Sequence, residues 1–229
     1  MKLGIMQPYF MPYAEYFRLI AACDVWIAFD TVKYNRKSWM NRNRIANRDK
    51  GWSYVRVPVA RGSETDSLAT ARIDATQDWR RALFDALRVY RHSAPHYEAV
   101  TAFLTETLAP EVETLAELNM LAIQGVCDRL GIATPLHRLS ALDLDLPEAC
   151  PPGEWALQIA REMGASTYLN ASGGTALFDP KLYAAEGIAL EFHEHIDLRY
   201  DTGPFDFVPD LSIIDAMMWV DRKTLTAAV

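Results

Sequence analysis

Two short apolar runs at the start of the chain, separated by an amphipathic segment, constrain the fold more than any other feature. Residues 3–6 and 25–29 have the length and composition of buried strands. Between them, Pro12 suits the first position of a helix, and Phe17 and Ile20 recur at helical spacing. Two buried strands with a helix between them pair in parallel through a right-handed crossover. The chain therefore opens as a β-α-β unit.

The remaining pattern predicts an α/β fold with a mostly parallel sheet and helices on both faces. After a strand at 52–59, helical periodicity covers 78–90, 97–108 and 113–130, within a largely helical segment at about 75–131. A proline-containing linker leads to alternating elements: a helix at 154–163, a strand near 167–169, a turn at 172–174, a helix at 180–185, a strand at 188–193 and a helix from about 211. With 229 residues and 50% hydrophobic content, we expect a single domain over 1–229.

Composition indicates a cytoplasmic protein without a membrane segment. The sequence has no apolar run of membrane-spanning length and no signal-peptide pattern at its start. Three cysteines without CxxC spacing argue against a disulfide framework or a zinc site, and His193 and His195 lack a third ligand. We therefore expect no bound metal.

Positive charge is concentrated in one segment of an acidic chain. Residues 33–61 contain nine basic side chains and one acidic side chain, a net charge of +8, whereas the whole chain carries −7 and the rest therefore −15. Such a segment attracts anions, although a solvated surface is the alternative. Because the remainder is acidic, a phosphorylated small molecule fits better as a partner than nucleic acid in general.

Residues 7–13 form the strongest local motif, because they join a buried strand to a helix N-terminus. Free backbone N–H groups at a helix start favour an anion, so Gln7, Tyr9 and Tyr13 are candidate binding residues. The glycines of a dinucleotide fingerprint and of a P-loop are both missing. The alternative is that these prolines and aromatic residues only shape and fill a tight turn.

A second motif lies in residues 31–50, which we interpret as a long polar loop. It contains the candidate binding residues Tyr34, Trp39, Arg42 and Arg44, and the candidate catalytic amides Asn41 and Asn43. Arginine and amide side chains suit phosphate or carboxylate groups. In an extended segment Arg42 and Asn43 cannot point the same way.

Polar residues also follow two predicted strands. Asp30 closes the second strand, where a carboxylate can accept a proton or hold an amine. Asn170, Gly173 and Gly174 form a turn after a later strand, and glycine allows close approach of a ligand to the backbone. A plain turn is the alternative. The sequence contains no GxSxG elbow and no recognisable Cys–His pairing.

The segments at 3–13, 24–30, 39–43, 168–174 and 211–215 together resemble the WbqC-like family. That resemblance implies a place in the biosynthesis of surface polysaccharides such as O-antigens, often those with acylated amino sugars. The opening is also similar to the nucleotidyltransferase-like fold, a HUP or Rossmann-like arrangement found in pantothenate synthetases and adenylyltransferases. Their histidine-glycine-histidine signature is replaced by residues 13–16 here, so adenylyl transfer by their mechanism is not implied.

We therefore expect a transferase that passes an acyl or aminoacyl group, such as glycyl, to an amino sugar or similar amine. Asp30 would accept the amine proton, Asn41 and Asn43 would orient the carbonyl, and Arg42 with Arg44 would hold phosphates. The alternatives are a non-catalytic module that binds a nucleotide sugar and a transferase that uses aminoacyl-tRNA. The sequence leaves open the donor, a use of ATP and the oligomeric state.

Overall fold

A five-stranded parallel sheet forms the centre of the computed structural model, which describes residues 1–63 and 66–229. Across the sheet the strands are β5 (Leu136–Arg138), β2 (Val25–Ala28), β1 (Lys2–Met6), β6 (Thr167–Ala171) and β7 (Ala189–His193). The first strand lies in the middle, and chain order runs outward from it in both directions, as in Rossmann-like sheets. The point where this order reverses lies between β1 and β6.

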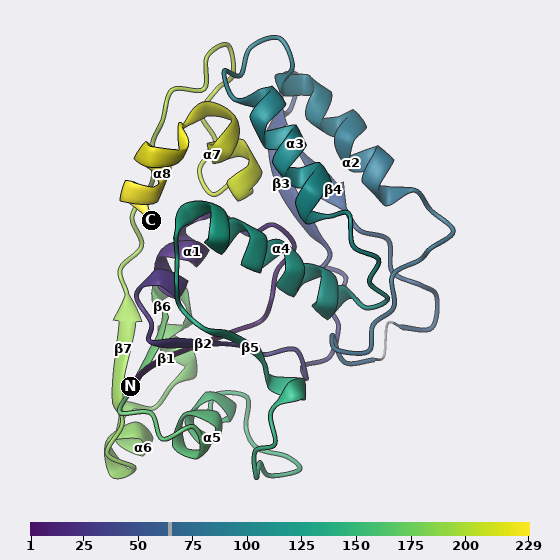
Figure 1. The fold of residues 1–229 in the computed structure, drawn as a ribbon. Coiled ribbons are helices and arrows are strands. Elements are labelled where there is room, and N and C mark those ends of the chain that lie inside the picture. The colour runs from purple at the N-terminus through teal and green to yellow at the C-terminus, as the bar shows by residue number, and fades with distance from the viewer. Residues whose placement is uncertain (64–65) are drawn as a thin grey trace.

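Helices cover both faces of this sheet, as the sequence predicts (Figure 1). On one face lie α1 (Ala14–Ala21) and α4 (Leu115–Leu130), and on the other lie α5 (Trp155–Glu162) and α6 (Pro180–Ala185). Alternate residues of β2 face opposite sides: Trp26 belongs to one buried cluster and Ile27 to the other. Because both faces are covered, the central strands β1 and β2 bury consecutive residues rather than alternate ones.

An antiparallel hairpin forms a separate two-stranded sheet. Its strands are β3 (Arg42–Asn47) and β4 (Gly51–Arg56). The interpretation of 31–50 as one long loop is therefore wrong in its second half. At the start of β3 the half-buried Arg42 and Arg44 flank the buried Asn43, so that polar residues on both faces hid the strand period.

Three further helices pack near this hairpin. They are α2 (Trp79–Leu87), which is extended by a 3₁₀ turn at Arg88–Tyr90, α3 (Tyr97–Thr107) and α7 (Ile213–Trp219). The expected single helix from about 211 is two helices, because Asp221 caps a new helix, α8 (Arg222–Ala228). Short 3₁₀ turns also follow β5, at Leu139–Ala141, and β6, at Ser172–Leu177.

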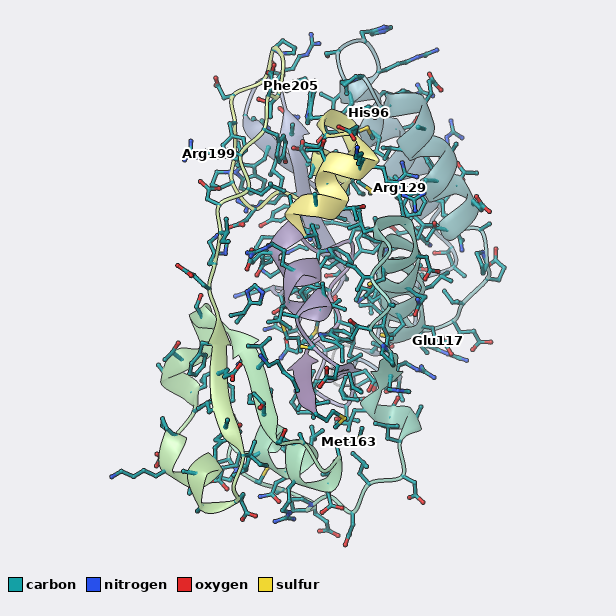
Figure 2. The ribbon with its side chains drawn as sticks, turned by 60° about the vertical axis from the view of Figure 1, so that its left-hand side comes forward. His96, Glu117, Arg129, Met163, Arg199 and Phe205 are labelled. Carbon is teal, nitrogen blue, oxygen red and sulfur yellow. The ribbon has the colours of Figure 1, made fainter. Side chains whose placement is uncertain are left out.

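An extended segment connects the edge strand β7 to the hairpin and the helices that pack near it. From the end of β7 the chain runs past Arg199 to Phe205 (Figure 2). There the ring of Phe205 contacts the rings of Tyr90 and Trp219. None of the helices in the described part of the chain has the length and hydropathy that spanning a bilayer requires.

Candidate functional site

The loop at residues 7–13 is held in place mainly by its carbonyl groups. Buried asparagine side chains supply two of the anchors. Asn119 Nδ2 donates to the carbonyl of Pro8, and Asn43 Nδ2 donates to the carbonyls of Phe10 and Met11. Three further donors reach the loop. The Tyr16 hydroxyl donates to the carbonyl of Gln7, Ser212 Oγ to that of Met11, and the backbone N–H of Ile213 to that of Pro12. Donors from the adjacent helix α1 and from the distant β3, α4 and α7 therefore fix a loop whose prolines lack N–H groups.

One residue of this loop adopts a conformation that is uncommon outside glycine. Met11 has φ of 43°, and its side chain is fully buried. A non-glycine residue at positive φ persists where surrounding contacts over-determine it. The two hydrogen bonds to the carbonyl of Met11 supply such contacts. The loop is thus rigidly held where it leaves β1.

The loop borders a cavity of about 820 Å³ at the carboxyl ends of β1, β2 and β6. This is the point where strand order reverses, the usual ligand site of open α/β sheets. Seven of the predicted binding residues line it: Gln7, Tyr9, Tyr13, Trp39, Asn170, Gly173 and Gly174. Tertiary folding therefore brings residues from three separate sequence motifs together around one space, which we call the switch cavity.

The glycine turn and Asn170 fit closely against each other. A Cβ atom at Gly174 would lie 2.8 Å from Asn170 Nδ2, whereas at Gly173 it would meet nothing within 4 Å. The other amide atom of Asn170, Oδ1, accepts from the N–H of Ala171. Gly174 thus leaves room for the amide of Asn170 beside the cavity, and the two glycines form a matched pair for mutagenesis.

The tyrosines of the loop remain protonated at neutral pH. Burial raises the pKa of Tyr9, and burial with neighbouring ionisable groups raises the pKa of Tyr13 to about 12. A protonated hydroxyl can donate as well as accept a hydrogen bond. Both tyrosines can therefore orient a polar group of a ligand while their rings pack against it.

Several cavity residues are absent from the sequence prediction. Among the described lining residues, the charged ones are Lys33 and Glu148, both exposed. Phe29, Trp155 and Phe178 add aromatic walls. Phe29 could have been found, because it ends a predicted strand. Glu148 lies within the proline-containing linker, and Trp155 begins the helix that follows it. Neither position carries a local signal for a site, because only the path of the chain brings it to the cavity.

The three predicted catalytic residues lie elsewhere. Asp30 is fully buried, and its two carboxylate oxygens accept from the N–H and hydroxyl of Ser140, at 2.9 and 2.5 Å. Asn43 is the loop anchor described above, and its Oδ1 accepts from the N–H of Arg44. Asn41 Nδ2 donates to the carbonyl of Val57. Each of these side chains binds protein groups outside the described lining of the switch cavity.

The predicted basic residues also separate. The guanidinium of Arg44 donates to the carbonyls of Pro209 and Asp210 and lies over the rings of Trp39 and Trp52. Arg42, with Tyr34 and Asn41, lines a different cavity, of about 520 Å³. As expected, Arg42 and Asn43 point in opposite directions, since Asn43 is buried and Arg42 reaches this outer cavity.

The two C-terminal histidines face separate acidic residues. His193 Nδ1 lies 3.2 Å from Glu15 Oε1, and His195 Nε2 lies 3.7 Å from Asp210 Oδ1. Burial lowers the pKa of His193. In the described part of the chain, no three His, Cys, Asp or Glu side chains are grouped to hold a metal ion.

Comparison with known proteins agrees with the motif pattern. A sequence model of the WbqC-like protein family matches residues 7–227. The chain belongs to the WbqC-like family. It is also 27% identical over 225 residues to the uncharacterized protein Rv1507c of Mycobacterium tuberculosis, covering 97% of this chain and 95% of the relative. No solved structure matches. In this WbqC-like chain the segments that carry the resemblance meet around the loop at 7–13, where they supply anchors and cavity walls.

Proposed function

We propose that this WbqC-like protein is a transferase that forms an amide by passing an acyl or aminoacyl group to the amine of an amino sugar. Its pathway would be the assembly of a surface polysaccharide or a related natural product. The observation that carries the proposal is the switch cavity, whose volume of about 820 Å³ suits a nucleotide-linked sugar. Its described lining residues combine aromatic and amide walls with one carboxylate, of Glu148, and one ammonium group, of Lys33.

In this proposal the walls of the cavity position the acceptor. The rings of Tyr9, Tyr13 and Trp39 pack against the faces of the sugar or base. The amides of Gln7 and Asn170 orient its polar groups, because both side chains stand where strands β1 and β6 end. Positioning of this kind supplies much of the rate in a reaction between two bound substrates.

Glu148 and Lys33 carry the proposed chemistry. The amine nitrogen attacks the carbonyl carbon of the donor, a C–N bond forms, and the bond from that carbon to the leaving group breaks. Glu148 accepts the proton from the amine and returns it to the leaving group. Lys33 stabilises the negative charge that develops on the carbonyl oxygen. Glu148 thus takes the role that the sequence suggested for Asp30, whose carboxylate is engaged by Ser140.

One observation favours a second candidate, a non-catalytic module that binds a nucleotide sugar for a partner enzyme. The described residues that line the switch cavity include no serine, cysteine or histidine. A direct transfer proceeds without a covalent intermediate on such a residue, and a binding module forms no intermediate at all. This lining therefore fits both candidates. The two candidates differ in turnover, so turnover decides between them.

The test combines binding with mass spectrometry. Thermal shifts with nucleotide-linked amino sugars should appear in the wild type and in Gly173→Ala, and should shrink in Gly174→Ala, where the new methyl group displaces the Asn170 amide. Incubation of a binding sugar with acyl-CoA, aminoacyl adenylates or aminoacyl-tRNA should then add one acyl or aminoacyl group. That product should be lost in Glu148→Gln.

Each result of this test has a distinct meaning. Binding without any mass increase for all three donor classes would refute the transferase and leave the binding module. A mass increase that Glu148→Gln does not slow would refute the role of Glu148. If no amino-sugar nucleotide binds, the switch cavity serves another class of ligand.

A further inference from the structure

A second cavity, outside the switch cavity, is lined mostly by cations. Its volume is about 520 Å³, and Arg36, Lys37, Arg42 and Arg56 line it together with Tyr34, Asn41 and Val59. Two of the cations come from the loop before β3, one from the start of β3 and one from the end of β4. We call it the arginine cleft. No acidic side chain is among its described lining residues.

The hairpin holds two of these cations against each other. Arg42 and Arg56 are directly opposite in the register of β3 and β4. Both guanidiniums lie over the ring of Tyr54, at 4.5 and 4.9 Å from its centroid. Like charges directly opposite each other destabilise a strand pair, and the aromatic ring offsets this only in part. An anion between the two guanidiniums would remove the repulsion.

The hydrogen bonds of the cleft also leave donors for a ligand. Arg42 uses Nε and one terminal nitrogen on the carbonyls of Ser38 and Lys37, which fixes its position and leaves part of its fork unused. Arg36, Lys37 and Arg56 take part in none of the ion pairs of the described residues. A preorganised fork surrounded by further cations is the arrangement that binds phosphate oxygens.

A buried acceptor indicates what accompanies the phosphate. The carboxamide oxygen of Asn41 is buried and has no hydrogen-bond partner among the described residues. A hydroxyl group next to the phosphate, as on a ribose or another sugar, would donate to it. The volume of about 520 Å³ suits one phosphorylated sugar rather than an extended polymer.

We propose that the arginine cleft is a binding site for the phosphate groups of a nucleotide or other phosphorylated sugar, separate from the switch cavity. The loop before β3 joins the two spaces, since Lys33 and Trp39 line the switch cavity while Arg36 and Lys37 line the cleft. The cleft would thus hold the phosphorylated end of the acyl donor. This last assignment rests on the proposed transferase function, whereas phosphate binding itself does not.

Titration calorimetry with ADP and with inorganic pyrophosphate tests the site. Arg56→Ala and Arg36→Ala should each weaken binding by about tenfold, the usual effect of losing a charge-assisted hydrogen bond. Lys50→Ala is the matched control, because it removes one exposed positive charge from the turn of the same hairpin, outside the cleft. It should change the affinity less than about twofold. Both arginines are exposed, so urea unfolding should show that the variants remain folded.

Three results would overturn the proposal. The first is no binding of either probe at about 1 mM. The second is an equal effect of Arg56→Ala and Lys50→Ala, which would indicate general charge attraction. The third is binding of a single-stranded RNA, dependent on Arg56, without binding of ADP, which would assign the cleft to nucleic acid.

The transferase proposal and the phosphate-binding proposal can be refuted independently of each other. Loss of transfer in Glu148→Gln with unchanged ADP binding would leave both proposals standing, since Glu148 lines the switch cavity and is not among the described lining residues of the cleft. ADP binding without any acyl transfer would refute the transferase alone. Transfer whose KM for the donor is the same in Arg56→Ala and the wild type would refute the donor role of the cleft alone.

Discussion

Replacing Asn43 with alanine should destabilise the fold strongly, although the sequence suggests a catalytic role. The side chain is buried, and its amide forms three hydrogen bonds: to the carbonyls of Phe10 and Met11 at 3.1 and 2.8 Å, and from the N–H of Arg44 at 2.8 Å. Each such bond contributes about 1 kcal/mol net. Met11 retains its bond from Ser212, but the carbonyl of Phe10 loses its side-chain donor.

The expected loss in the free energy of unfolding is therefore about 3 kcal/mol, a large part of the 5–15 kcal/mol typical of a folded domain. In urea, a slope of about 3 kcal/mol/M converts this loss into a midpoint about 1 M lower. Equilibrium unfolding followed by circular dichroism measures it. Asn35→Ala is the control: Asn35 is exposed and its Oδ1 accepts one hydrogen bond, from the N–H of Lys37, so this variant should lose at most about 1 kcal/mol.

A loss below about 1 kcal/mol in Asn43→Ala would refute the anchoring argument. Normal stability together with lost turnover would instead favour the catalytic role. A third outcome is that Asn43→Ala loses both stability and turnover, and that neither a lower temperature nor added ligand restores the turnover. This result would agree with a loop that no longer positions Gln7, Tyr9 and Tyr13.

Two further predictions follow from buried ionisable groups. Burial raises the pKa of Asp215 above its ordinary value of 3.8, so the folded state holds the proton more tightly. The stability that this group contributes is present below pH 3.8 and is lost as pH rises through the raised pKa. The unfolding free energy of the wild type minus that of Asp215→Asn should therefore fall as pH rises above 3.8, and a constant difference would contradict this. Burial also raises the pKa of Cys23 and Cys127 to about 12, whereas Cys150 is half-buried. At about pH 8 a thiol reagent should label Cys150 first, and rapid labelling in Cys150→Ser would contradict the burial of the other two.

The family motif has a structural meaning that its sequence does not reveal. Residues 7–13 include both cavity residues and a backbone whose carbonyls need donors. Asn43 and Ser212 supply these donors from two of the other segments that carry the WbqC-like resemblance. Residues in such a motif can thus act on the site by holding the loop, without contacting a ligand.

The sequence alone determined the parallel β-α-β opening, the helices on both faces, and the strand ends and loops that border the switch cavity. These follow from local periodicity, because the burial of one face of a helix or strand depends on residues a few positions apart. For the same reason Gln7, Tyr9 and Asn170 could be named as cavity residues: they follow buried parallel strands, whose carboxyl ends meet at one edge.

Only the tertiary structure decided the partners of the polar side chains. Asn119 binds the carbonyl of Pro8 across 111 positions, and Asp30 accepts from Ser140 across 110. No local pattern encodes such pairs, because a buried amide or carboxylate is satisfied by whichever donor the fold brings near. Asp30 and Asn43 therefore look like site residues in the sequence and are fully engaged by protein groups in the fold. Glu148 reaches the cavity from a segment that carries no signal, and nothing local distinguishes Lys33 from the other cations of the basic segment.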